Sequence, residues 1–204
     1  MSRPRAFDED EALDSAIDCF WQQGLEATSV RDLASQMGIN APSLYNTFGG
    51  KRALFALALE RYATRSMRER IQRLEANYAP KDALNAFCRE IVDRSVADRN
   101  RRGCLIVNAA LEVAPHDREL RVIISGYLGE IEGFFGRCIS RAQMTGDVPR
   151  HLDPRDTARL LLGIVLGIRV AARAKPDRTL LEGMLRPALA TLDLPTRKPT
   201  KGKQ

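Results

Sequence analysis

Apolar residues recur along this chain at the three- and four-residue spacing of amphipathic helices, and no stretch alternates apolar and polar residues as a strand would. The pattern predicts about nine helices joined by short polar, proline- or glycine-containing connections. Their expected ranges are 8–23, 30–37, 42–48, 51–77, 81–97, 104–113, 117–144, 155–174 and 178–192. We therefore expect an all-α protein in which a small N-terminal domain precedes a larger helical bundle.

The segment 29–51 is predicted to form two short helices joined by a tight turn. Ser29 occupies an N-cap position, and Gly38 follows the last apolar residue of the first helix, where a left-handed residue is usual. Asn40 is expected to cap the second helix, with Pro42 in its first turn. Apolar side chains of both helices can face inward, which leaves outside hydroxyls, an amide and a phenol: Ser43, Tyr45, Asn46 and Thr47. This is the helix-turn-helix layout for reading DNA.

The helix expected over 8–23 adds a third helix to this unit. Before it, Arg3 and Arg5 lie in an N-terminal arm, for which a solvated terminus and a DNA-contacting arm are equally good interpretations. The organisation that follows has three parts. These are a helix-turn-helix DNA-binding domain at 1–52, a helical ligand-binding and dimerisation domain at 53–195, and a disordered basic tail at 196–204.

The net charge of +6 permits a polyanionic partner, but its distribution weakens that argument. Residues 1–52 carry five basic and eight acidic side chains, a net charge of −3, so DNA binding must depend on where the cations lie. The four cysteines form no C-x-x-C pair and there are two histidines, so neither a metal site nor a cofactor is expected. Without a membrane-length apolar run or a signal-peptide pattern, we expect a cytoplasmic protein.

From Ala16 to Phe55 the chain carries the spaced pattern A–x3–F–W–x2–G–x–E–A–T–S–V–R–D–L–A–x3–G–I–x3–S–L–Y–N–T–F–G–G–K–x2–L–F. This pattern resembles the tetracycline-repressor-like family of transcriptional regulators. It covers roughly the first quarter of the chain, and the later helices resemble the family at the level of the fold. The resemblance implies a homodimer that binds a palindromic operator in double-stranded DNA, usually as a repressor released by a small-molecule effector.

The resemblance also implies which residues meet DNA. Tyr45 matches an aromatic that packs on the DNA backbone, and Lys51 matches a phosphate-contacting lysine. Thr28 and Ser29 match the helix N-terminus that faces a phosphate. The expected DNA-binding residues are Arg3, Arg5, Thr28, Ser29, Pro42, Ser43, Tyr45, Asn46, Thr47 and Lys51.

A ligand site is expected in the C-terminal helices. Asn108 and Glu112 are four residues apart and so share a helix face. If that face is inward, they are polar groups in an apolar cavity; if it is outward, Glu112 pairs with an arginine at the surface. Both interpretations remain open. The candidate ligand-binding residues are Phe87, Ile91, Cys104, Asn108, Leu111, Glu112, Tyr127, Ile131 and Phe134.

Cys104 is the strongest candidate for a reactive thiol. It is expected in the first turn of a helix beside Arg101 and Arg102, and both a helix N-terminus and nearby cations favour a thiolate. The more ordinary interpretation is a small residue buried at a helix start. The segment 102–120 resembles a subgroup of the family with Gly-Cys-Leu at this point, and the resemblance implies release by an electrophile or oxidant.

The last two helices are apolar enough to form a dimer interface. Gly163 and Gly167 lie four apart in the first of them, where close approach of another helix would offset their cost of about 1 kcal/mol each. Packing within one chain is the alternative explanation. The candidate dimer residues are Leu160, Gly163, Ile164, Gly167, Leu181, Met184 and Leu185.

Two other function classes compete with a ligand-responsive repressor. A helical enzyme with Cys104 as nucleophile would need a base, and His116 and His151 are the candidates. An activating or architectural DNA-binding protein without an effector also fits the helix-turn-helix. We expect a regulator rather than an enzyme, because no motif ties either histidine to Cys104.

Overall fold

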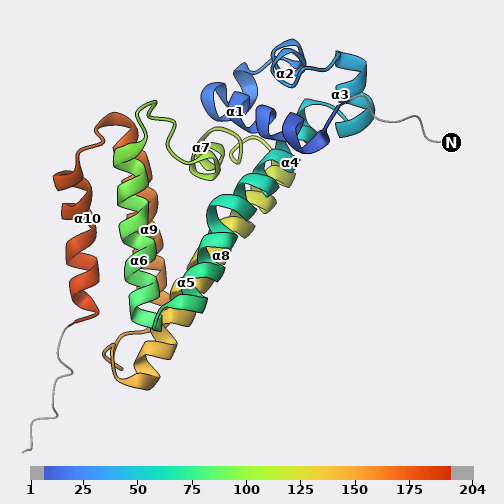
Figure 1. Ribbon diagram of the computed structural model, residues 1–204. Helices are drawn as coiled ribbons and strands as arrows, with labels where there is room; N and C mark the ends of the chain where they lie inside the picture. Colours follow the sequence, from blue (N-terminus) through green and yellow to red (C-terminus); the bar gives the residue numbers. More distant parts are fainter. Residues whose placement is uncertain (1–6, 194–204) are drawn as a thin grey trace, which may run out of the picture. The chain divides into compact units, whose positions relative to one another are not determined.

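The computed structural model describes residues 7–193 of the 204-residue chain, so Arg3, Arg5 and the predicted tail at 196–204 lie outside the described residues. The described part is all-α and contains no strand (Figure 1). Its elements are α1 (Glu9–Ala27), α2 (Val30–Gln36), α3 (Ala41–Phe48), α4 (Lys51–Ala63), η1 (Thr64–Arg68), α5 (Glu69–Asn77), α6 (Pro80–Ala97), α7 (Leu105–Glu112), α8 (Arg118–Thr145), α9 (Pro154–Ala174) and α10 (Arg178–Thr191). The predicted fold class is confirmed.

Two helices differ from their predicted ranges in an informative way. Gly24 was expected to end the first helix, but α1 resumes after it and ends at Ala27. Gly24 has φ 82° and ψ 172°, so it breaks the helix and leaves a separate last turn. The helix predicted over 51–77 is helical throughout, but η1 inserts a π-helical turn between α4 and α5. Periodicity alone signals neither the resumed turn nor the π-helical turn.

The described residues form two compact units. The first contains residues 7–70 and 102–128, and the second contains residues 71–101 and 129–193. The first unit therefore extends past residue 52, because α4, α7 and the first part of α8 belong to it. The functional domains expected at 1–52 and 53–195 stay predictions.

The core of the first unit is built around α1 and α4. Phe20 meets Phe55 edge-to-face with ring centroids 4.9 Å apart, and Trp21 meets Tyr62 in the same way at 5.0 Å. Such pairs add about 0.5–1.5 kcal/mol to the apolar burial. Leu33 from α2, Leu44 from α3 and Leu54 and Leu59 from α4 are fully buried. This shared core gives the two short helices α2 and α3 a fixed support.

The second unit has its own core. Phe87 from α6 packs against Phe134 and Phe135 from α8, with all three centroid separations between 5.3 and 5.6 Å. Helices α6, α9 and α10 lie side by side (Figure 1), and Leu161 of α9 and Leu181 of α10 are buried. None of the described helices is both long and apolar enough to cross a membrane.

Candidate DNA-binding interface

Helix α2 begins with a reciprocal cap. The Ser29 hydroxyl accepts a hydrogen bond from the Asp32 backbone N–H at 3.1 Å, while the Asp32 carboxylate accepts from the Ser29 backbone N–H at 3.1 Å. This capping box satisfies two of the open donors at the helix start. The hydrogen bonds from Ser29 hold the pKa of Asp32 below its usual value. A seven-residue helix is too short to be stable alone, so this cap and the shared core define where α2 begins.

The turn and the ends of α3 follow the predicted chemistry. Gly38 has φ 66°, the left-handed conformation that glycine adopts without strain. The Asn40 side chain accepts from the Ser43 backbone N–H at 2.8 Å, which caps α3, and a proline occupies the first turn. Gly49 then ends α3 with φ 76°. Both ends of this helix are therefore determined by adjacent residues.

The outer face of α3 is open to solvent. Pro42, Tyr45 and Asn46 are exposed, and Ser43 and Thr47 are half-buried. Tyr45 is 55% exposed, although its ring lies over Gly50, whose added Cβ would come within 3.3 Å of it. Within residues 7–193 the Tyr45 hydroxyl and the Asn46 amide make no hydrogen bond. These groups are therefore available to an external partner, as the sequence predicted.

Two predicted DNA contacts have partners inside the protein. Thr28 is 1% exposed and its hydroxyl donates to the Gly24 carbonyl at 2.5 Å, so its side chain is a cap within the fold and we no longer assign it to DNA. The Lys51 ammonium donates to the carbonyls of Leu25 at 2.9 Å and Glu26 at 3.4 Å. Lys51 therefore holds the last turn of α1, with one donor left for a phosphate.

The acidic residues of α1 are directed to arginines of the same unit. Asp10 and Asp14 bind Arg61 of α4, each at 2.6 Å, and Asp14 also binds Arg65 at 2.5 Å. Asp18 binds Arg102 at 2.9 Å. The two arginines lower the pKa of Asp14 to about 2. Three of the eight acidic side chains in residues 1–52 are thus paired with arginines of the same unit.

One cation near the candidate interface was missed. Arg31 is exposed in the first turn of α2, beside Ser29, and forms no ion pair within residues 7–193. Arg52 is the opposite case, because it forms salt bridges to Asp117 at 2.6 Å and Glu119 at 2.8 Å. Exposure next to a helix start was the available signal for Arg31, and we add it to the candidate DNA-binding residues.

The candidate ligand residues do not all line one cavity. Leu111 is 63% exposed. Asn108 donates to the Arg102 carbonyl at 2.8 Å. Glu112 accepts from the Glu26 backbone N–H at 3.3 Å, so neither of its two predicted roles is seen. Neither prediction for Glu112 considered a backbone partner on α1.

The other candidate ligand residues are buried or half-buried. Phe87 and Phe134 are fully buried against each other, which makes them core residues. Ile91 is 5% exposed and Ile131 is half-buried. Tyr127 is 4% exposed and donates its hydroxyl to Glu60 at 2.9 Å. A ligand site built from these residues stays a prediction.

Cys104 is the N-cap of α7 and lies one residue before the position that was predicted. Its side chain makes no capping hydrogen bond, and it is half-buried. Cys19, Cys88 and Cys138 are buried. Burial raises the pKa of Cys88 and that of Cys138 to about 12, so these two thiols stay protonated near neutral pH. Cys104 is therefore the most accessible of the four thiols.

Some of the candidate dimer residues are buried within the chain and others are exposed. Leu181 is 0% and Leu185 is 4% exposed, so both pack within their own chain and cannot face a partner, contrary to the prediction. An added Cβ at Gly167 would lie 3.3 Å from the Met184 methyl group, so this glycine and Met184 serve the contact between α9 and α10. Leu160 and Gly163 are exposed and Ile164 is half-buried.

Two family models match separate parts of the chain. The model for bacterial regulatory proteins of the tetR family matches residues 12–58. The model for the tetracyclin repressor-like C-terminal domain matches residues 80–187, which is more than half of the chain.

Two curated relatives are similar over nearly their full length. The HTH-type transcriptional repressor ComR of Escherichia coli (strain K12) is 30% identical over 193 residues, 94% of this chain and 90% of ComR. The uncharacterized HTH-type transcriptional regulator YezE of Bacillus subtilis (strain 168) is 32% identical over 194 residues, 95% of this chain and 100% of YezE.

Among solved structures, a cysteine mutant of the TetR family transcriptional regulator CifR, complexed with 26-bp double-strand operator DNA, superposes with a TM-score of 0.83. It is 34% identical, and the match covers 94% of this chain and 100% of that one. Since both family models match and relatives of at least 30% identity align over almost the whole length, the chain belongs to the tetR family of bacterial regulatory proteins.

Proposed function

We propose that this protein is a ligand-responsive transcriptional repressor that binds a palindromic operator as a homodimer. The outer face of α3 carries the proposal. Tyr45 and Asn46 stand exposed on a helix that is capped at both ends, and their polar groups make no hydrogen bond within residues 7–193. A rigid helix with unpaired polar side chains is what the major groove accepts, because base edges there offer donors and acceptors.

The other DNA contacts follow from the position of α3. The free N–H groups at the start of α2 and the exposed Arg31 can meet a phosphate beside the groove. The CifR structure contains operator DNA, which supports operator binding by this chain. ComR is named a repressor, which supports repression over activation. A cytoplasmic location goes with this role, because the operator lies there.

A two-fold operator requires two copies of the chain. Leu160 and Val170 on α9 are 50% and 46% exposed, and Leu180 on α10 is 41% exposed. Ten residues separate the two positions on α9, about 2.8 helical turns, so the two side chains are about 80° apart around the helix axis and share one half of its surface. We assign the dimer contact to this exposed face rather than to the buried Leu181 and Leu185.

The release signal is proposed to be a small molecule or an electrophile that reacts at Cys104. Accessibility and its place at the start of α7 support Cys104 over the other cysteines. Cys104→Ser changes the shape of the side chain little but removes the thiolate chemistry. If a quinone or hypochlorite releases the Cys104→Ser variant from DNA as readily as the wild type, the cysteine is not the sensor.

Selection of bound sequences from randomised DNA duplexes tests the DNA-binding function without knowledge of the operator. The expected product is a two-fold symmetric site with half-site centres about one helical turn, roughly 34 Å, apart. Its affinity should fall steeply with salt, since phosphate contacts release counterions. Recovery of no preferred sequence would contradict the proposal.

A cysteine-dependent enzyme has less support. A thiol nucleophile needs a base within hydrogen-bond reach, and within residues 7–193 Cys104 makes no hydrogen bond to His116 or His151. A reporter assay distinguishes a repressor from an activator. Expression of a reporter placed downstream of the selected site should rise when the gene for this protein is deleted, whereas loss of an activator would make it fall.

A further inference from the structure

The last turn of α1 is a separate segment held between two charged side chains. Gly24 interrupts the helix with φ 82° and ψ 172°, a conformation that side-chain-bearing residues rarely adopt. Residues 25–27 then complete one more turn, and Ser29 begins α2 directly afterwards. The position of this turn therefore determines where the DNA-facing start of α2 lies.

At one end of this turn, α7 supplies a carboxylate. Glu112 Oε1 accepts a hydrogen bond from the Glu26 backbone N–H at 3.3 Å. An added Cβ at Gly24 would lie 2.5 Å from the same oxygen, and closer still to Oε2. The carboxylate thus occupies the space that any other side chain at position 24 would fill. Glycine is required here both for its backbone conformation and for this approach.

At the other end, α4 supplies an ammonium group. Lys51 donates to the carbonyls of Leu25 and Glu26, while the Thr28 hydroxyl donates to the Gly24 carbonyl. An anion near the N–H groups and a cation near the carbonyls of one turn both match the direction of its peptide dipoles. The turn is therefore positioned electrostatically from both sides by residues of other helices.

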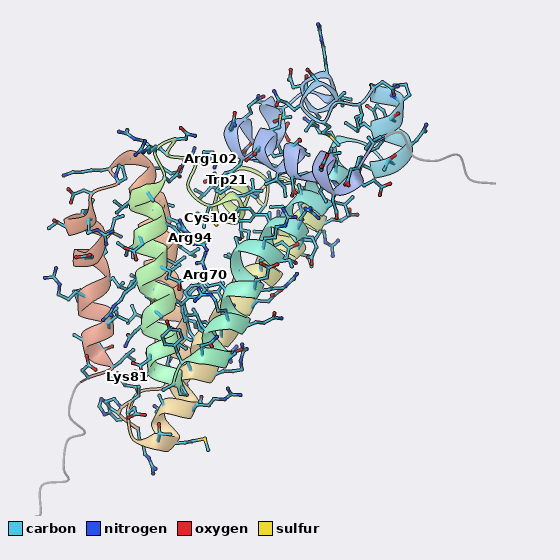
Figure 2. All side chains as sticks on the ribbon, in the orientation of Figure 1. Trp21, Arg70, Lys81, Arg94, Arg102 and Cys104 are labelled. Carbon is cyan, nitrogen blue, oxygen red and sulfur yellow. The ribbon has the colours of Figure 1, made fainter. Side chains whose placement is uncertain are left out.

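Helix α7 holds α1 at a second place, on the other side of Gly24. The Arg102 guanidinium lies over the Trp21 ring at 4.2 Å from its centroid and binds Asp18. Asn108 ties the Arg102 carbonyl to α7. Figure 2 shows Trp21 and Arg102 with Cys104, the N-cap of α7. A shift of α7 would therefore pull on α1 both before and after its break.

We propose that Glu112 is a positioning residue that holds the last turn of α1, and through it the start of α2, in the arrangement that binds DNA. A movement of α7 that withdraws this carboxylate lowers operator affinity. An ordered turn loses less conformational entropy on binding than a loose one, so the contact favours the DNA-bound form. This inference rests on the proposed DNA-binding function and names the contact through which α7 acts on it.

The test compares Glu112→Ala and Glu112→Gln with Glu26→Gln in the full-length protein. Glu26 is the matched control: its exposed carboxylate lies in the same turn, but only its backbone N–H takes part in the contact. Fluorescence anisotropy with a duplex selected by the wild type should show a fivefold to twentyfold weaker affinity for Glu112→Ala, within the usual range for coupled sites. Glu112→Gln keeps the acceptor oxygen and should lose less.

The direction of the effect separates positioning from simple electrostatics. Removing a carboxylate near a polyanion should by itself strengthen binding, so Glu26→Gln should bind as well as the wild type or slightly better. Amide exchange of Glu26 in the free protein provides a second measurement that a purely electrostatic role would not change. It should be at least tenfold faster in Glu112→Ala than in the wild type and unchanged in Glu26→Gln.

Wild-type affinity in both Glu112 variants would overturn the inference, as would an equal loss in Glu26→Gln. Faster Glu26 exchange with unchanged affinity would also overturn it, because the contact would then exist without affecting DNA binding. In each of these cases the wild type still binds its selected duplex, so the proposed function stands. If the wild type selects no duplex, the proposed function and this inference fail together.

Discussion

Helices α3 and α7 make an instructive pair. Each has eight residues, each belongs to the first compact unit, and each carries polar side chains on one face. On α3 the exposed Tyr45 and Asn46 have no hydrogen-bond partner in residues 7–193. On α7, Asn108 and Glu112 both bind groups of the same unit. The same pattern in the sequence thus leaves polar groups open to solvent in one helix and pairs them internally in the other.

The difference shows what a polar helix face can and cannot indicate. Spacing indicates which side chains share a face, but it does not indicate what that face meets. The caps add information, because the α3 ends are determined by neighbours such as Asn40, whereas the α7 N-cap, Cys104, makes no side-chain hydrogen bond. The ends of α3 are capped by its own neighbours, so its polar face can point to solvent. Helix α7 instead depends on its contacts with α1.

The largest expected effect is on DNA affinity and comes from the exposed face of α3. The double variant Tyr45→Ala, Asn46→Ala should bind the selected duplex about 100-fold more weakly, since a good base contact and a backbone contact are each worth roughly tenfold or more. Its melting temperature should stay within about 2 °C of the wild type, because neither polar group has a partner in the fold. Anisotropy titration and calorimetry measure the two quantities. Gln22→Ala, at an exposed position on α1, is the control.

Gly24→Ala should give the largest loss of stability, because it disturbs the contact between the last turn of α1 and Glu112 of α7. We expect about 2–3 kcal/mol, from a backbone conformation that alanine rarely adopts and from collision with Glu112. Urea unfolding of Gly24→Ala and of Gly24→Ala, Glu112→Ala separates the two causes. The second substitution should recover part of the loss, and no recovery would mean that the carboxylate does not occupy this space in solution.

The acidic residues of α1 resemble the polar residues of α7, because their partners lie inside the same unit. Arg61 and Arg65 hold the pKa of Asp14 at about 2, below its ordinary value of 3.8, so this pairing stabilises the fold above about pH 4 and is lost as the pH falls towards 2. Asp14 is 40% exposed, and after allowance for solvent screening Asp14→Asn should cost about 1 kcal/mol at pH 7. Urea unfolding between pH 7 and 2.5 should show this difference shrinking only below pH 4; a constant difference would exclude the ion pair as its source.

The smallest expected effect concerns the α7 cap. Serine caps a helix start better than cysteine, and the backbone at position 104 is already extended, as an N-cap requires. Cys104→Ser should therefore stabilise the fold by about 0.5 kcal/mol, as measured by urea unfolding. Asn40→Ala removes an existing cap and should destabilise by about 1 kcal/mol. A loss of stability in Cys104→Ser would mean that packing of the sulfur outweighs capping.

The parts that were predictable from the sequence are those determined by adjacent residues. The α2–turn–α3 unit follows from Ser29, Gly38, Asn40 and Gly49, each of which acts within one turn of its own position. The exposed face of α3 follows from the same boundaries. Helix ranges elsewhere agree closely for the same reason, since periodicity and capping are local properties.

The parts that were missed depend on distant residues. The Glu112 carboxylate meets a backbone N–H 86 residues away, and no helix spacing encodes that partner. Asp14 and Arg61 are 47 residues apart, so a count of charges in residues 1–52 could not show that this carboxylate is paired. On the last two helices, an apolar pattern could not separate Leu181, which packs inward, from Leu180, which is exposed. Tertiary contacts decide all three cases.

Amide hydrogen exchange of the full-length protein, with and without its selected duplex, tests most directly whether α3 is the DNA-reading helix. Peptides covering residues 40–48 and the start of α2 should exchange more slowly in the complex, because the duplex covers them. Unchanged exchange over 40–48, with protection elsewhere on the protein, would contradict the assignment of α3 to the major groove.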